Sequence, residues 1–369
     1  MLPLSDQDAR CLRDASAAAD AAGMLQPEQQ ALVHRRGWLK MLAPLDRGGA
    51  ELPLPAAVRI EEAIAAADGS AGWVVTLCAG AGWFAGFLPP ALAQEILDTP
   101  GLCVAGSGAP SGFADRDGSG YRISGQWGHA SGAPIATHFT LNAVLRDAGR
   151  PLLDPAGAAC IRAFIVPAAE VEIVPTWHAI GLRATASHAF RIRDRWVPAS
   201  HGFDIDAAAA THPGPLYRFP FLPLALVTLA ANLAGMAQHF IELARTLVGQ
   251  RRHPLGEARL GDSAGVQTML RQAEDALAAA RDRFHALLDA AWAHVESGSA
   301  IGAPDTQALQ AASLALVRAA RVAVDGLYPH CGLQAADLRS EINRVWRDFH
   351  TATQHALWSL EFDTAPSFA

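Results

Sequence analysis

The sequence predicts a mostly helical α+β protein, with a helical domain at each end of the chain and a small antiparallel β-barrel between them. Both ends are rich in alanine and leucine, with apolar residues at helical spacing. The middle consists of short apolar runs separated by Gly, Pro and Asp, as in strands joined by turns. We therefore expect an N-terminal helical domain at 1–100, a β-barrel domain at 101–205 and a C-terminal helical bundle at 206–369.

Composition excludes several classes of protein. The chain has 369 residues, 51% of them hydrophobic and 18% charged, so it is neither disordered nor a small disulfide-stabilised scaffold. The formal net charge is −7 and the sequence has no long basic run, which disfavours nucleic acid or an anionic membrane as the main partner. Five Cys residues without a Cys-x-x-Cys pair are interpreted as reduced thiols of a cytoplasmic protein without a metal site. A small molecule is the expected ligand.

Two stretches without charged residues, 70–94 and 219–240, are long enough to span a bilayer. The first is interrupted by Pro89 and Pro90, and the second carries the polar residue Asn232. Neither is flanked by a basic cluster, and the first residues of the chain lack the pattern of a signal peptide. We interpret both stretches as buried helices and expect no membrane association.

The N-terminal domain shows amphipathic helices. Leu12, Ala15 and Ala19 would share one helical face, and Ile60 and Ile64 would share another. Helices with such faces are expected to bury them against one another.

The middle domain contains six runs typical of strands. The segment 115–120, Asp-Arg-Asp-Gly-Ser-Gly, has the composition of a hairpin loop. Short strands at this spacing predict a small antiparallel barrel or sandwich. The six runs are 102–105, 121–124, 139–145, 163–166, 171–174 and 189–192.

The C-terminal part predicts a four-helix bundle. Its helical patterns lie near 221–249, 264–297, 304–327 and 337–358, with glycine-containing loops between them. The sequence has neither a Gly-x-Gly-x-x-Gly turn between a strand and a helix nor a Gly-x-x-x-x-Gly-Lys loop. Any nucleotide must therefore be held by other means.

Four segments of the chain carry motifs. The first contains a Pro-x-x-x-Gly-Gly turn, the second the run Gln-Trp-Gly-His-Ala-Ser-Gly, the third Gly-Leu-Arg-Ala-Thr-Ala-Ser, and the fourth Arg-Val-Trp-Arg-Asp-Phe-His. They lie within 42–51, 123–132, 177–187 and 344–355. In this order they resemble the acyl-CoA dehydrogenase superfamily, and within it the two-component, group D type of flavin-dependent monooxygenase.

The resemblance implies an acyl-CoA dehydrogenase-like fold with reduced FMN or FAD between the barrel and the C-terminal bundle. It also implies a homotetramer, a separate flavin reductase that supplies the reduced flavin, and dioxygen as a substrate beside a small organic compound.

The resemblance further assigns residues to the flavin. Trp127 would form a wall of the ring site and Ser131 a donor near N5, although core packing and a turn are the alternatives for these two residues. Arg183, Thr185 and Ser187 alternate along a predicted strand, so they would bind a phosphate or line the substrate entrance, or else form an exposed face.

Arg251 and Arg252 occupy the place where the family carries an Arg that contacts the flavin phosphates across a subunit boundary. A planar guanidinium suits this role because it binds phosphate through two parallel hydrogen bonds. A solvated helix end is the alternative, since cations also suit the helix C-terminus.

The candidate catalytic residues are histidines. Dehydrogenases of this superfamily use a Glu as base, but no carboxylate occurs between Asp348 and Glu361, and Ala225 occupies the other usual position. A conventional dehydrogenase is therefore disfavoured. In the monooxygenase branch an imidazole near the flavin moves a proton at neutral pH, which makes His355 the first candidate and His129 the second. A histidine satisfied within the core is the alternative for His355.

The substrate pocket is assigned to aromatic residues that equally suit a core: Trp73, Trp83 and Phe84. Many monooxygenase members carry a second His just before a Trp that resembles Trp83, whereas this chain has Gly82 there. Because glycine is smaller than histidine, we expect a wider pocket and a different substrate.

The sequence thus predicts a flavin-dependent oxidoreductase, a monooxygenase that hydroxylates a small aromatic substrate. An acyl-CoA dehydrogenase-like oxidoreductase without the usual Glu and a binding module that has lost the flavin are the alternatives.

Overall fold

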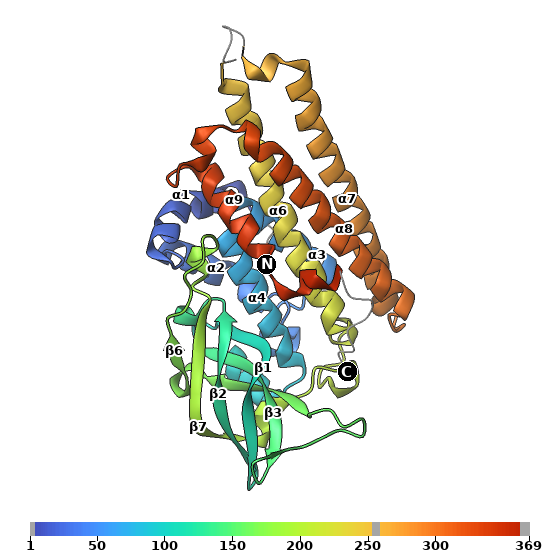
Figure 1. Cartoon of the computed structure of the whole chain (residues 1–369). Helices are drawn as coiled ribbons and strands as arrows, with labels where there is room; N and C mark the ends of the chain where they lie inside the picture. The colour runs from blue at the N-terminus through green and yellow to red at the C-terminus, as the bar shows by residue number, and fades with distance from the viewer. Residues whose placement is uncertain (1–3, 253–258, 362–369) are drawn as a thin grey trace.

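Helices from both ends of the chain stand over one end of a single sheet (Figure 1). This computed structural model describes residues 4–252 and 259–361. The N-terminal helices are α1 (Asp6–Ala22), α2 (Pro27–Arg36), α3 (Leu54–Ala67), α4 (Gly69–Trp83) and α5 (Pro90–Leu97). The C-terminal helices are α6 (Phe221–Gln250), α7 (Ala264–Glu296), α8 (Ala303–Leu327) and α9 (Glu341–Ala352). The predicted mostly helical α+β class is confirmed.

Local capping explains where the first helices begin and end. The Ser5 hydroxyl accepts a hydrogen bond from the Asp8 N–H, and the Asp8 carboxylate accepts one from the Ser5 N–H. Gly23 ends α1 in the left-handed conformation, with a φ of 69°. The carboxylate of Asp68 caps α4 by accepting from the N–H of Ala71 at 2.6 Å.

The middle of the chain forms one mixed sheet. Its strand order is β6-β7-β2-β1-β3-β5-β8, and β4 pairs with β3 beside this path. Every pair is antiparallel except β1 with β3, which is parallel. The strands are β1 (Val104–Asp117), β2 (Gly120–Ala130), β3 (His138–Asp147), β4 (Arg150–Pro151), β5 (Ile161–Pro167), β6 (Glu172–Val174), β7 (His188–Pro198) and β8 (Gly202–Phe203).

This topology corrects the predicted antiparallel barrel. In the described residues the sheet is open, with β6 at one end of the order and β8 at the other. The predicted hairpin loop joins β1 to β2, and Gly118 occupies the turn with a φ of 58°. After β2 the chain returns to the opposite edge of β1, so β3 runs parallel to it. Strand-length patterns do not specify which edge of β1 receives β3.

The N-terminal and C-terminal helices share one hydrophobic core, and the sheet has a second. Helix α6 packs against α3 as well as against α7, α8 and α9. The approach to α3 is close, because a Cβ on Gly235 would lie 2.2 Å from the carbonyl oxygen of Glu62. A separate four-helix bundle is therefore not confirmed, since α3 belongs to the same packing unit as α6.

The last predicted helix, 337–358, is shorter in the structure. Ser340 caps α9 by accepting from the N–H of Asn343. After Ala352 the chain turns, and the carbonyl oxygen of Thr353 accepts from the Arg321 guanidinium at 2.9 Å. His355 follows this turn and directly precedes a short 3-10 helix, Ala356–Glu361.

Among the described residues, α6 is the helix with the length and hydropathy to cross a membrane. It coincides with the apolar stretch 219–240 singled out in the sequence. Because 78% of its apolar window is buried inside the protein, α6 is a core helix of this fold.

Candidate functional site

The two candidate catalytic histidines lie near enough to interact electrostatically, one after α9 and the other near the end of β2. His355 lies half-buried after α9, with its ring edge-on to Trp73 at a centroid distance of 5.9 Å. His129 lies exposed near the end of β2, edge-on to Trp177 at 6.0 Å. Burial lowers the pKa of His355 to about 4, and the charge of nearby His129 contributes to this shift. His355 is therefore uncharged at neutral pH.

The hydrogen bonding of His355 defines its tautomer. Its Nδ1 accepts from the N–H of Leu357 at 3.3 Å, which leaves the ring proton on Nε2. His355 thus offers an N–H donor at Nε2.

His129 departs from strand geometry. Its φ is 62°, and the pairing of β2 with β7 shifts register between Trp127 and Ala130. The simple alternation that would give His129 and Ser131 the same face is therefore broken: His129 is exposed and Ser131 is buried.

Three predicted flavin residues form a buried chain of hydroxyl groups. Thr185 donates to the carbonyl oxygen of Leu182 at 2.7 Å, so it accepts from Ser187, whose Oγ is 2.6 Å away. Ser187 in turn accepts from Ser131 at 2.8 Å. Each hydroxyl proton in the chain therefore points to the next oxygen in the direction of Leu182. The Ser131 oxygen consequently has its lone pairs free to accept a hydrogen bond.

The expected alternation of Arg183, Thr185 and Ser187 on one strand face is wrong. Residues Arg183–Thr185 form a short 3-10 turn, bounded by Leu182 and Ala186 with φ values of 49° and 45°. These left-handed residues change the direction of the chain before β7 begins. As a result Arg183 is exposed, whereas the two hydroxyl side chains are buried.

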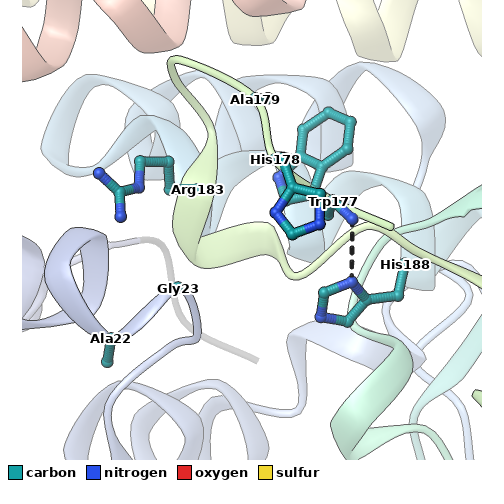
Figure 2. Close-up of a pocket in the computed structure, with 7 residues that line it drawn as sticks. All are labelled: Ala22, Gly23, Trp177, His178, Ala179, Arg183 and His188. Carbon is teal, nitrogen blue, oxygen red and sulfur yellow. Dashed lines mark hydrogen bonds between the residues drawn. The ribbon is translucent and has the colours of Figure 1, made fainter. Parts of the chain in front are cut away.

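Arg183 lines an open cavity of about 430 Å³, whose wall includes Trp177, the residue that His129 contacts (Figure 2). None of its lining side chains is acidic. His188 Nδ1 accepts from the backbone N–H groups of Trp177 and Thr176 at 3.2 and 3.3 Å, so its ring proton lies on Nε2. Burial, together with nearby His178, lowers the pKa of His188. The lining residues are Ala22, Gly23, Trp177, His178, Ala179, Arg183 and His188.

Sequence reasoning missed Trp177, His178 and His188, although two of them lie within a quoted motif. The sequence shows them only as one indole and two imidazole side chains within a short stretch, a pattern that does not by itself indicate a site. The loop that brings them together depends on long-range contacts that the sequence does not display.

Trp127 lies in the core of the sheet. Its indole N–H donates to the carbonyl oxygen of Asn142 at 2.8 Å, and its ring stacks on Phe190 at 5.3 Å. A Cβ at Gly112 would lie 2.2 Å from this ring, so a glycine makes the close approach possible.

The predicted pocket aromatics separate into two places. Trp73 contacts His355, as described above. Trp83 and Phe84 instead join an aromatic cluster with Tyr217 and Phe221, and the Trp83 indole N–H donates to the carbonyl oxygen of Leu216 at 3.1 Å.

Arg251 and Arg252 lie exposed at the end of α6 that is remote from the sheet (Figure 1). The Arg251 guanidinium donates to the carbonyl oxygen of His330 at 2.6 Å. The structure does not bring this pair to the histidines within the described chain.

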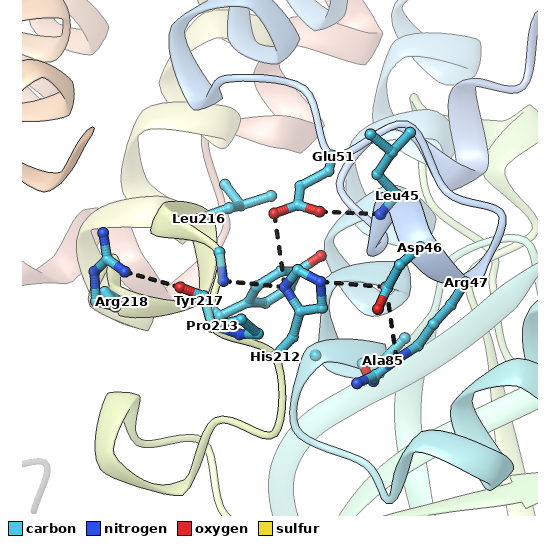
Figure 3. A network of polar contacts seen from close by, with 12 residues as sticks. Leu45, Asp46, Arg47, Glu51, Ala85, His212, Pro213, Leu216, Tyr217 and Arg218 are labelled. Carbon is cyan, nitrogen blue, oxygen red and sulfur yellow. Dashed lines mark hydrogen bonds and ion pairs between the residues drawn. The ribbon is translucent and has the colours of Figure 1, made fainter. Parts of the chain in front are cut away.

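A second polar cluster holds the Pro-x-x-x-Gly-Gly turn (Figure 3). His212 Nε2 lies 3.2 Å from a carboxylate oxygen of Asp46, and its Nδ1 accepts from the N–H of Gly214. Glu51 accepts from the N–H of Leu45 across the same turn. These contacts attach the turn to the segment that leads into α6. In the described ranges, no group of three or more His, Cys, Asp or Glu residues is placed to hold a metal ion.

Comparison with known proteins identifies the fold. Residues 227–360 match the family described as acyl-CoA dehydrogenase, C-terminal domain. The structure resembles the crystal structure of 3-HSA hydroxylase from Rhodococcus sp. RHA1, with a TM-score of 0.89, 20% identity and coverage of 97% of this chain and 92% of the other. The acyl-CoA dehydrogenase-like fold is thereby confirmed.

Two curated relatives extend the likeness over most of the sequence. A pigment production hydroxylase of Rhodococcus sp. is 28% identical, over 89% of this chain and 84% of the relative. The oxygenase component of an FADH2-dependent resorcinol hydroxylase from Rhizobium sp. is 27% identical, over 86% of this chain and 81% of the relative. The resemblance to the monooxygenase branch of the superfamily is thereby confirmed.

Proposed function

We propose that this acyl-CoA dehydrogenase-like chain is the oxygenase component of a two-component flavin-dependent monooxygenase. It takes reduced FMN or FAD from a separate reductase and uses dioxygen to hydroxylate a small aromatic substrate. The contact of His129 with Trp177, a wall of the cavity, carries the proposal, together with the electrostatic interaction between His129 and His355. The relatives' names support the reaction class, since both are hydroxylases and one is an FADH2-dependent oxygenase component.

The residues present fit a flavin. The cavity of about 430 Å³ lies within the usual range of small-molecule sites, about 300–1,000 Å³. The Arg183 guanidinium and the His188 Nε2–H are donors suited to a phosphate or a ring oxygen. Ser131 presents lone pairs, which suits the N–H that a reduced flavin carries at N5. We propose this acceptor role in place of the expected donor role, and it favours the reduced cofactor.

Bound reduced flavin supplies the activation of dioxygen for transfer of one oxygen atom to the substrate. His355 remains uncharged and donates from Nε2, and His129 brings a second imidazole from the sheet. Trp73 is buried and gives this site an apolar wall. Together these groups can hold a substrate oxygen and move a proton at Nε2 of His355.

We further propose that the protein is a cytoplasmic homotetramer. Large apolar side chains of the C-terminal part, Val322, Leu333 and Leu338, are 68%, 91% and 73% exposed, which supports burial against another copy. Arg251 and Arg252 are exposed and thus available to a flavin phosphate bound by a neighbouring subunit.

The test combines binding with isotope transfer. Purified protein is titrated anaerobically with reduced FMN and reduced FAD, then mixed with ¹⁸O₂ and a panel of phenols and indoles. We expect tight binding of one reduced flavin and a hydroxylated product that carries one ¹⁸O atom.

Other outcomes separate the alternatives. Anaerobic reduction of bound oxidised flavin by an acyl thioester, without oxygen transfer, would identify dehydrogenase chemistry. Absence of binding to either flavin in any redox state would instead identify a binding module of the same fold.

A further inference from the structure

We propose that Asp348 and Arg347 of α9 are positioning residues that hold the segment 177–187 in the conformation required for flavin binding. The inference rests on the proposed function, because it concerns the same cavity. Both side chains are buried, at 4% and 6% exposure, and they contact the segment through different groups. These contacts explain why the segment that lines the cavity has a fixed shape.

The backbone of Leu182 is the centre of this arrangement. Its N–H donates to the Asp348 carboxylate at 2.5 Å. Its carbonyl oxygen accepts from the indole of Trp177 at 2.9 Å and from the hydroxyl of Thr185 at 2.7 Å. One peptide segment therefore connects α9 to the aromatic wall of the cavity and to the hydroxyl chain of Ser131.

The conformation of Leu182 needs such support. Its φ of 49° is unfavourable for a residue with a side chain and costs about 1–3 kcal/mol in general. The Leu182 N–H is buried, and leaving it without the Asp348 acceptor would cost about 1–3 kcal/mol more, so this hydrogen bond can offset the cost of the conformation.

Arg347 fixes the start of the segment and the opposite wall of the cavity. Its guanidinium donates to the carbonyl oxygen of Ile180 and forms two parallel hydrogen bonds with the Asp20 carboxylate, at 3.2 and 2.8 Å. Its Nε donates to the Asn343 side chain at 2.9 Å. Asp20 lies on α1 just before Ala22, which lines the cavity. Arg347 thus links both walls to α9.

Gly181 allows the segment to lie directly on α9. A Cβ at this position would lie 2.0 Å from the carbonyl oxygen of Arg347, which is helix backbone and cannot yield. A substitution there displaces the segment without changing any polar group. Gly181→Ala is therefore a perturbation independent of Asp348.

The experiment measures hydrogen exchange of residues 177–187 in the flavin-free protein, together with dissociation constants for reduced and oxidised FMN and FAD. Asp348→Ala and Gly181→Ala should accelerate exchange of the Leu182 amide and weaken flavin binding, each on the order of tenfold to a hundredfold. Asp348→Asn keeps an oxygen acceptor and should stay close to the parent protein. Gly326→Ala in α8, where an added Cβ meets no atom within 4 Å, is the matched control.

The outcomes distinguish this inference from the function on which it rests. Melting temperatures identify any variant that fails to fold. If Asp348→Ala does not fold, the comparison of Asp348→Asn with Gly181→Ala still tests the proposal. Parent-like exchange at Leu182 in both perturbing variants would overturn it, as would faster exchange with unchanged flavin affinity. If the parent protein binds no flavin, the proposed function fails, whereas the exchange data still decide whether α9 holds the segment.

Discussion

The carboxylate of Glu62 in α3 and the imidazole of His285 in α7 face each other in the helical core, with Oε2 and Nε2 2.7 Å apart. Arg281, one turn earlier on α7, contacts the other oxygen of the same carboxylate. Glu62 is 3% exposed, so its charge depends on these two partners rather than on water. This contact ties the N-terminal helices to the C-terminal ones.

Replacing Glu62 with Ala should lower the free energy of unfolding by roughly 2–3 kcal/mol. Loss of the carboxylate leaves the His285 and Arg281 side chains without their shared partner, although Arg281 reaches solvent and limits the cost. Urea denaturation measures the change. The control is Asp289→Ala, which removes the exposed ion pair of Arg59 with Asp289 between the same two helices. It should cost less than about 1 kcal/mol, and equal losses would contradict the role of burial.

Glu61 should make the protein less stable as the pH rises. Both of its carboxyl oxygens are buried without a hydrogen-bond partner in the described chain, and burial raises its pKa to about 8. Between its ordinary value of 4.5 and about 8, the folded protein keeps a proton that the unfolded chain has lost. The free energy of unfolding therefore falls with rising pH by up to about 1.4 kcal/mol per unit over this window.

Glu61→Gln removes this titration and provides the comparison. Burial also raises the pKa of Asp348, to about 7, with the same sign, so the difference between the parent and the variant isolates Glu61. Denaturation curves at about pH 5 and about pH 8 should show a steeper loss in the parent protein. Parallel pH profiles for the two proteins would mean that Glu61 is not the group responsible.

Much of the fold follows from local patterns. The apolar stripes of α6, α7 and α8 predicted these helices nearly to their observed bounds, and the Asp-Gly-Ser turn predicted the hairpin of β1 with β2. The parallel pairing of β1 with β3 did not follow, because it depends on which edge of β1 remains free after the hairpin forms. Sheet closure was mispredicted for the same reason.

The candidate site was predictable in part. His129 and His355 were selected as imidazoles within motifs; in the structure they interact electrostatically, while their catalytic role stays a prediction. Leu182 and Ala186 carried no signal, because an apolar residue with positive φ is held there by distant contacts. That conformation exposes Arg183 and forms the cavity with Trp177, which a strand pattern could not reveal.

The direction of the hydroxyl chain predicts a preference for reduced flavin. In Thr185→Val the acceptor of the Ser187 proton is lost, so Ser187 can turn toward Ser131 and leave Ser131 free to donate. Oxidised flavin has a lone pair at N5, whereas reduced flavin has a hydrogen there. The ratio of the two dissociation constants should therefore shift toward the oxidised form by about tenfold.

Anaerobic titration with reduced flavin and fluorescence titration with oxidised flavin give this ratio. Thr228→Val, which removes another buried hydroxyl bonded only within α6, should leave the ratio unchanged. Equal weakening of both redox states in Thr185→Val would contradict the directional argument.

His355→Ala should separate flavin binding from oxygen transfer. The substitution removes the Nε2–H donor but leaves the hydroxyl chain and the cavity intact, so reduced flavin should still bind. Hydroxylated product per NADH, measured with a flavin reductase, should fall at least about a hundredfold because a positioned proton donor is lost. Because the pKa of His355 is about 4, its titration should cause no fall in the parent rate near the ordinary histidine pKa of 6.5.

His350→Ala is the control, since this neighbouring imidazole pairs with Asp325 outside the site. Full product yield in His355→Ala would place the proton transfer on another group, with His129 next to be replaced, because it is the other imidazole at this junction.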